Sequence, residues 1–155
     1  FDSNFKMNPP LRTEADIEAI IEGIADGTLT ILCSDHAPHA FYEKEVEIDH
    51  APVGITGLEN EFSTFCDILV HKRAAISLAR LIALYTAEPA RLLKLDRGTL
   101  SVGAPGDVTI IDPDLEWTFD KNKSVSLSHN TPFHGHTWKG RAVRTIVAGE
   151  TVWAL

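Results

Sequence analysis

The stretch ILCSDHAPH, residues 31–39, joins an apolar run to a group of polar residues. The run begins earlier, as TLTILCSD over residues 28–35, and its nearly continuous apolar character predicts a strand buried on both faces of a parallel sheet. That strand would end on Asp35. In a parallel barrel, catalytic groups sit at the carboxyl ends of the strands, where the loops converge over the axis. Asp35 is therefore a candidate catalytic or metal-binding carboxylate, and the alternative is an aspartate that caps a turn.

The residues before this strand predict a helix. Thr13 suits its N-cap, Gly27 suits its end, and Ile17, Ile20, Ile21 and Ile24 recur at helical spacing. A helix followed by a two-sided strand is an α/β pattern. Further helices are predicted after the long polar loop 36–57, over residues 58–69, from Ser77 and from Thr86.

After Gly98 the pattern changes to short strands joined by glycine and proline turns. Residues 141–155, RAVRTIVAGETVWAL, predict a hairpin with Gly149-Glu150 as its two-residue turn. The chain is thus expected to divide into an α/β part, residues 1–96, and a β part, residues 97–155.

The composition is that of a soluble globular protein, with 44% apolar and 23% charged residues among 155. The formal net charge of −8 argues against nucleic acid and anionic membranes as partners. No apolar run reaches the roughly 18 residues that a membrane span needs. Cys33 and Cys66 both read as reduced core residues, which favours a cytoplasmic protein.

Other polar residues near Asp35 could belong to the same site. His39 could reach back over the strand end to a substrate carboxylate, whereas His36 need not face the same way. Asn8 would point at the same mouth if it follows a strand, and it is otherwise a turn residue before Pro9. Gly54 would let backbone groups approach a ligand closely. The pair His134 and His136 has metal-ligand spacing but lies in a loop of the β part, so we do not expect a metal there.

Several motifs in order resemble the C-terminal portion of a class I, bacterial-type dihydroorotase of the amidohydrolase superfamily. SDHAP indicates an amidohydrolase, and NPPLR favours dihydroorotase over allantoinase or dihydropyrimidinase. The motifs are NFKMNPPLR (4–12), SDHAPH (34–39), APVGITGLE (51–59), TAEPARLLKLDRGTLSVGAPGDVTIID (86–112) and NTPFHGHTWKGRAVRTIVAGETVW (130–153).

The resemblance implies a fold, a reaction and a set of roles. The fold would be the C-terminal part of a (β/α)8 TIM-type barrel plus a small β-sandwich, and the reaction the interconversion of N-carbamoyl-L-aspartate and L-dihydroorotate in pyrimidine synthesis. Asp35 matches the aspartate that contacts zinc and serves as general base and acid. Asn8 and His39 match substrate-binding positions, and Val53 with Gly54 matches the loop whose backbone meets the pyrimidine ring.

The remaining metal ligands of such an enzyme, which holds one or two Zn²⁺ ions, would precede Phe1. We therefore expect a fragment that binds zinc poorly, is inactive alone, and associates with itself, with the missing barrel portion or with other enzymes of pyrimidine synthesis. Three alternatives stay open: another cyclic amidase of the allantoinase or dihydropyrimidinase type, a non-catalytic dihydroorotase-like scaffold, and an independent β-sandwich binding module.

Overall fold

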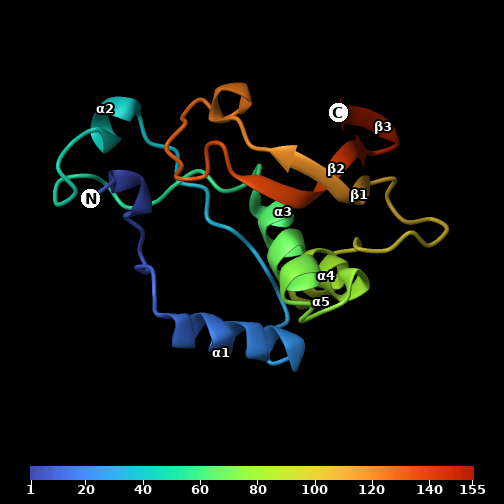
Figure 1. The fold of residues 1–155 in the computed structure, drawn as a ribbon. Helices are drawn as coiled ribbons and strands as arrows, with labels where there is room; N and C mark the ends of the chain where they lie inside the picture. Colours follow the sequence, from blue (N-terminus) through green and yellow to red (C-terminus); the bar gives the residue numbers. More distant parts are fainter.

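The computed structural model describes residues 1–155, which form a helical cluster, a three-stranded sheet and long connecting loops (Figure 1). The α-helices are α1 (Glu14–Ala25), α2 (Phe41–Lys44), α3 (Glu61–Phe65), α4 (Leu78–Tyr85) and α5 (Ala87–Leu93). A π-helical segment, η2 (Cys66–Lys72), continues α3, and two 3₁₀ turns are η1 (Ser3–Phe5) and η3 (Lys121–Lys123). The strands are β1 (Val108–Thr118), β2 (Thr137–Val147) and β3 (Glu150–Ala154).

Helices α1, α4 and α5 begin where the local sequence predicts, whereas the helix predicted from residue 58 begins at Glu61 and the predicted loop 36–57 contains the short helix α2. At α1, the amide and hydroxyl of Thr13 both donate to the Asp16 carboxylate, at 3.0 and 2.7 Å. At α4, the Ser77 hydroxyl accepts from the amide of Arg80 at 3.2 Å. Gly27, with φ of 88°, follows the end of α1. These ends are correctly predicted because capping involves only neighbouring residues.

The strand predicted over residues 28–35 is absent. The segment is extended but pairs with no strand, and its contact with the helices includes the Leu32 amide donating to the Leu84 carbonyl at 3.2 Å. Cys33, expected in the core, is exposed, whereas Cys66 is buried as predicted, and both thiols are free. A parallel strand is buried only between neighbouring strands and helices, and β1–β3 form a separate antiparallel sheet.

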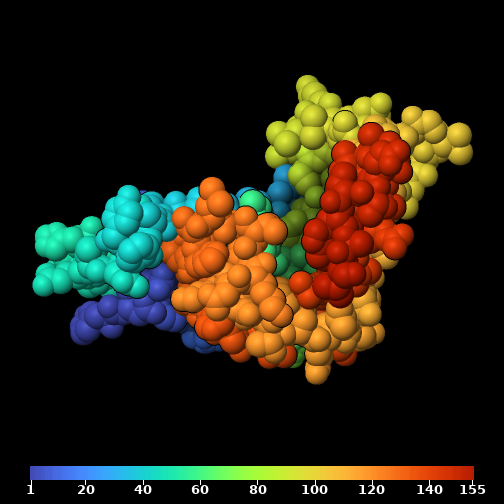
Figure 2. All heavy atoms as spheres, turned by 90° about the horizontal axis from the view of Figure 1, so that it is seen from above, coloured from blue at the N-terminus to red at the C-terminus, as the bar shows by residue number.

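The core is small for a chain of this length. Five residues from α1, η2 and α4 form it: Ile24, Cys66, Leu69, Leu81 and Leu84. On α1, Ile17 and Ile20 are 42% and 52% exposed, so half of its predicted apolar face is uncovered. The accessible surface is 10026 Å², whereas a compact monomer of 17.0 kDa is expected to expose roughly 7,700 Å². Figure 2 shows the segment around α2 projecting from the rest of the molecule.

The sheet is antiparallel in the order β1-β2-β3, with β2 in the centre. Its β2–β3 hairpin is confirmed, but the turn is Ala148-Gly149, one residue earlier than predicted. Both turn residues have positive φ, 50° and 84°, as a type I′ turn requires. The sequence predicts several short strands before this hairpin, and the structure joins them into β1, with a register shift around Pro113, which has no amide to donate.

The sheet packs directly on the helical cluster. A side chain at Gly140 of β2 would place its Cβ 2.5 Å from the Cys66 sulfur, so only glycine allows this approach. The indole Nε1 of Trp117 in β1 donates to the Ser63 hydroxyl of α3 at 3.0 Å. None of the helices has the length and apolar character needed to cross a membrane. The structure is thus an α/β arrangement with one small sheet.

Candidate functional site

The Asp35 carboxylate lies at the end of the extended segment, next to Gly54. One carboxylate oxygen, Oδ1, accepts from the amide of His36 at 2.8 Å. The Ser34 hydroxyl donates to the Asp35 carbonyl at 2.7 Å, which fixes the backbone that carries the carboxylate. The other oxygen, Oδ2, makes no hydrogen bond within the chain and lies 3.8 Å from the position that a Cβ on Gly54 would take. Asp35 therefore presents a free oxygen to the Val53–Gly54 loop.

Two glycines allow this loop to touch the Asp35 segment. A Cβ at Gly54, whose φ is +106°, would lie 2.4 Å from the Cβ of Ala37. A Cβ at Gly57 would lie 2.4 Å from the Asp35 carbonyl oxygen and 2.1 Å from the Ser34 hydroxyl. Both distances are far below van der Waals contact, so the site has this shape only because these residues lack side chains.

The two histidines that follow Asp35 have different surroundings. His36 Nδ1 accepts from the amides of Gly57 and Leu58 at 3.2 and 3.4 Å, so this ring joins the loop to the start of the α3 region. His39 Nε2 lies 3.0 Å from the Val53 carbonyl oxygen and donates to it. The expectation that the two rings need not face the same way is consistent with these partners, and only His39 reaches the Val53–Gly54 loop.

Most backbone groups of Val53 and Gly54 are already hydrogen bonded. The Val53 carbonyl accepts from His39, and the Gly54 amide donates to the Lys6 carbonyl at 2.9 Å. The Gly54 carbonyl accepts from Lys44 Nζ at 3.1 Å. The Val53 amide makes no such bond, which leaves it as the backbone donor that could meet a ligand.

Asn8 follows, by two residues, Lys6, whose carbonyl accepts from the Gly54 amide. Its side chain is exposed and makes no hydrogen bond within the chain. An unengaged amide at this place could donate to a ligand. The structure therefore brings together Asp35, His39, Val53 and Gly54, whereas Asn8 is linked to them only through the neighbouring Lys6 backbone.

Asn130 holds the site together, although no motif in the sequence marks it. This residue is 5% exposed and comes from the loop between η3 and β2. Its Nδ2 donates to the Ala37 and Gly54 carbonyls at 2.9 and 3.3 Å, and its Oδ1 accepts from the His39 amide at 3.0 Å. Its own carbonyl accepts from the amide of Thr56 at 3.0 Å. Asn130 thus joins the two loops that carry the candidate residues.

Two lysines support the outer part of the loop through its carbonyl groups. Lys6 Nζ donates to the Ala51 carbonyl at 2.7 Å and to that of Asp49 at 3.1 Å. Lys44 is 3% exposed, and besides Gly54 it donates to the Pro52 carbonyl at 2.9 Å. Burial lowers the pKa of Lys44, and the positive charge of Lys6 lowers it further. The negative charge of Asp2 opposes this shift, and the ammonium itself donates to carbonyl oxygens rather than to a carboxylate.

The residues of this chain do not form a metal site by themselves. Nowhere do three or more histidine, cysteine, aspartate or glutamate side chains lie together as metal ligands. Asp35 could supply one carboxylate ligand, whereas a protein zinc site uses at least three protein ligands. His134 lies 3.7 Å from the Asp120 carboxylate, and His136 stacks on Trp138 at 4.7 Å between ring centroids.

The sequence matches the model of the amidohydrolase family over residues 7–152. Among curated proteins it is similar to the dihydroorotase of Solibacter usitatus, with 47% identity over 154 residues. The dihydroorotase of Citrifermentans bemidjiense is 49% identical over 153 residues. Each alignment covers 99% of this chain and 36% of the relative. The chain therefore spans about a third of the length of these relatives.

Solved structures agree in fold. The L-hydantoinase (dihydropyrimidinase) of Arthrobacter aurescens superposes with a TM-score of 0.87 at 30% identity, over 97% of this chain and 35% of that one. The dihydropyrimidinase of Brevibacillus agri gives a TM-score of 0.85 at 22% identity, over 98% of this chain and 34% of that one, which is a likeness of fold alone.

Proposed function

This chain belongs to the amidohydrolase family, and on that premise we propose that it contributes the catalytic carboxylate of a dihydroorotase. The reaction would interconvert N-carbamoyl-L-aspartate and L-dihydroorotate by closing and opening a cyclic amide. The observation that carries the proposal is the meeting of Asp35, His39 and the Val53–Gly54 backbone in one place. The similarity of the chain to the dihydroorotases of two bacteria supports the choice of substrate.

Asp35 would act as the general base and acid. Its Oδ1 accepts from the His36 amide, and its Oδ2 is free to take a proton from the water that attacks the ring carbonyl and to deliver it to the ring nitrogen as the C–N bond breaks. The absence of a side chain at Gly54 would leave the carboxylate open to the substrate, because a Cβ there would lie 3.8 Å from Oδ2.

Asn8, His39 and the Val53 amide would bind the substrate's carboxylate and ring polar groups. The Asn8 amide and the Val53 amide are both unengaged, so each can donate without losing a bond. His39 Nε2 donates to the Val53 carbonyl, so binding a substrate carboxylate would require the ring to exchange that acceptor for the ligand. Such an exchange would also change the position of the Val53–Gly54 loop.

Zinc is the cofactor we propose for the whole enzyme, with Asp35 as one ligand. The residues of this chain do not form a zinc site by themselves, so the other zinc ligands would come from the remaining part of the enzyme. When bound, zinc would polarise the amide carbonyl and activate water. The part played by this chain is proton transfer at Asp35 and substrate orientation.

We further propose that the chain is the C-terminal part of a (β/α)8 barrel, residues 1–96, followed by a β-sandwich segment, residues 97–155, in a cytoplasmic enzyme. The large exposed surface supports association with a barrel portion or with a second copy. Segment 28–35, which is extended without a pairing partner, would become a barrel strand in that assembly.

A chimera tests the function. Residues 1–155 would replace the matching third of the Solibacter usitatus dihydroorotase, and dihydroorotate ring opening would be measured with added zinc. We expect activity, and Asp35→Asn should lower kcat by about 10²- to 10⁴-fold. Glu47→Gln, which removes an exposed carboxylate from the same loop, should leave kcat unchanged.

A second candidate is a hydantoinase-like cyclic amidase, because the Arthrobacter aurescens L-hydantoinase is 30% identical with a TM-score of 0.87. If the chimera hydrolyses hydantoin or allantoin but not dihydroorotate, the result favours the hydantoinase-like activity and overturns the first proposal. A folded, zinc-loaded chimera with no activity on any of these substrates would indicate a non-catalytic scaffold.

A further inference from the structure

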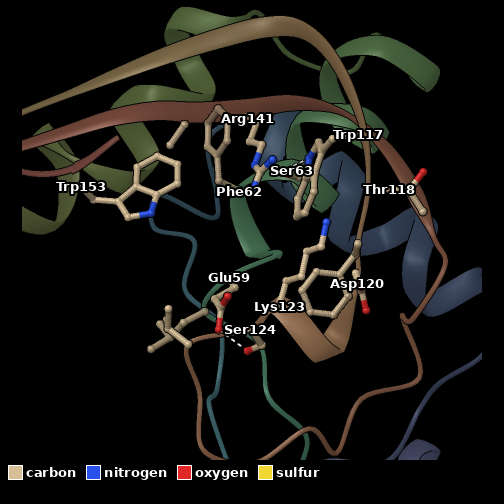
Figure 3. A pocket seen from close by; sticks show the side chains of 14 residues that line it. Glu59, Phe62, Ser63, Trp117, Thr118, Asp120, Lys123, Ser124, Arg141 and Trp153 are labelled. Carbon is tan, nitrogen blue, oxygen red and sulfur yellow. Dashed lines mark hydrogen bonds between the residues drawn. The ribbon is translucent and has the colours of Figure 1, made fainter. Parts of the chain in front are cut away.

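A cavity of about 420 Å³ lies between the α3 region and the sheet, and its lining does not include Asp35, His39 or Gly54 (Figure 3). Its walls come from the start of α3, from β1 and β2, from the η3 loop and from Trp153 of β3. The volume is within the range of small-molecule sites. Nothing in the candidate site uses this space.

Two cations at this cavity lack an anionic partner. The guanidinium carbon of Arg141 lies 4.1 Å from the centre of the Trp117 ring, and the group makes no hydrogen bond or ion pair within the chain. Lys123, at the opposite side of the opening, also has no ion pair, and Figure 3 shows its ammonium directed toward Trp117. Stacking on the indole uses one face of the guanidinium and leaves its N–H edges free.

The Arg141 charge is partly removed from water. Burial lowers the pKa of Arg141, and the negative charge of Glu59 only partly opposes this shift. A desolvated cation without a hydrogen-bond acceptor is unfavourable, and an anion placed beside it would compensate for that cost through charge-assisted hydrogen bonds.

The carboxylates of the lining are already committed to other donors. Glu59 Oε1 accepts from the Ser124 hydroxyl and from the Ser126 amide, the latter at 3.2 Å. Asp120 Oδ1 accepts from the Asn122 amide at 3.0 Å. The cavity therefore presents two cationic side chains without an ion pair, while one oxygen of each lining carboxylate is engaged by neighbouring donors.

Aromatic rings make up much of the remaining wall. Trp117 is held in place by its bond to Ser63, and Phe119 packs against it with 5.9 Å between ring centroids. In Figure 3, Trp117 and Trp153 lie on either side of Arg141. Such faces favour a flat, unsaturated molecule.

We propose that this cavity binds a planar aromatic anion of one or two rings. Its carboxylate or equivalent group would accept hydrogen bonds from Arg141 and Lys123, and its ring would pack against the Trp153 indole, which is 40% exposed. This site is independent of the proposed dihydroorotase function.

Calorimetric titration of the chain with 2-naphthoate and with its neutral analogue 2-naphthamide tests the proposal. We expect 2-naphthoate to bind at least about tenfold more tightly than 2-naphthamide, because hydrogen bonds to a charged group are stronger than those to a neutral one. Arg141→Met should remove this preference and leave the affinity for 2-naphthamide unchanged. Arg144→Met, an exposed arginine of the same strand, should leave both affinities unchanged.

Equal affinity for the acid and the amide in the unaltered chain would overturn the proposal, and this comparison needs no variant. If Arg144→Met removes the preference for the anion as fully as Arg141→Met does, the proposal is also overturned, because the preference then reflects a general charge effect. If circular dichroism shows that Arg141→Met is unfolded, Lys123→Met takes its place, since Lys123 is exposed and contributes little to packing.

Discussion

Replacing Asn130 with alanine should loosen both loops of the candidate site without loosening the sheet. The change removes one acceptor for the His39 amide and two donors, to the Ala37 and Gly54 carbonyls. The Gly54 carbonyl keeps its bond from Lys44, so the loss there is small. The His39 amide and the Ala37 carbonyl each lose their one hydrogen-bond partner, which costs about 1 kcal/mol or somewhat more for each group. The local cost is therefore about 2 to 3 kcal/mol.

Hydrogen exchange measures this local cost residue by residue. The Ala37 amide donates to the Ile55 carbonyl at 2.8 Å, and the Thr56 amide donates to the Asn130 carbonyl at 3.0 Å. Both bonds depend on the loops staying together. A loss of 2 to 3 kcal/mol predicts exchange at these two amides that is about 30- to 150-fold faster.

Amides of the β1–β2 ladder, such as those around the Trp117 and Trp138 pair, should keep their rates. The control variant is Asn122→Ala, which removes an exposed side chain whose Nδ2 donates to Asp120 at 3.1 Å. It should change no rate at Ala37 or Thr56 by more than about threefold. The reasoning is refuted if Asn130→Ala accelerates these two amides less than about threefold, or if the ladder accelerates equally.

Two further predictions concern a half-buried carboxyl group and the two thiols. Burial raises the pKa of Glu61 above its ordinary value of 4.5, and the Tyr85 hydroxyl and Ser34 amide oppose this only in part. A raised folded-state pKa means that stability is complete at low pH and is lost as pH rises through that pKa. Glu61→Gln should therefore match the parent in urea midpoint below pH 4.5 and exceed it increasingly above; a pH-independent difference would contradict this. Burial also raises the pKa of Cys66 to about 11, while Cys33 is exposed. One thiol should react quickly with Ellman's reagent near neutral pH, and Cys33→Ser should abolish that phase, whereas its loss in Cys66→Ser would show the opposite assignment.

Local features could be predicted from the sequence alone. The helix starts at Thr13 and Ser77 and the β2–β3 hairpin depend on residues a few positions apart, and the structure has all three. The hairpin turn was misplaced by one residue, because Ala148 adopts a positive φ that favours glycine or asparagine.

Part of the candidate site could be predicted from the sequence. Asp35 and His39 are close in the chain, and the structure places both against the loop that carries Gly54. Asn130 was missed, because it is more than 90 residues from Ala37 and His39 and its partners are mainly backbone groups. No sequence pattern marks a side chain whose function is to join two distant loops.

The sequence by itself determined the starts of α1, α4 and α5 and which residues could carry the chemistry, because capping and side-chain chemistry are local properties. Only the tertiary structure decided what those segments touch. The apolar run 28–35 has the composition of a buried strand, yet it is unpaired and leaves Cys33 exposed. Burial and strand pairing depend on neighbouring strands and helices from the rest of the fold. An apolar pattern predicts that a segment is buried but does not specify which elements cover it.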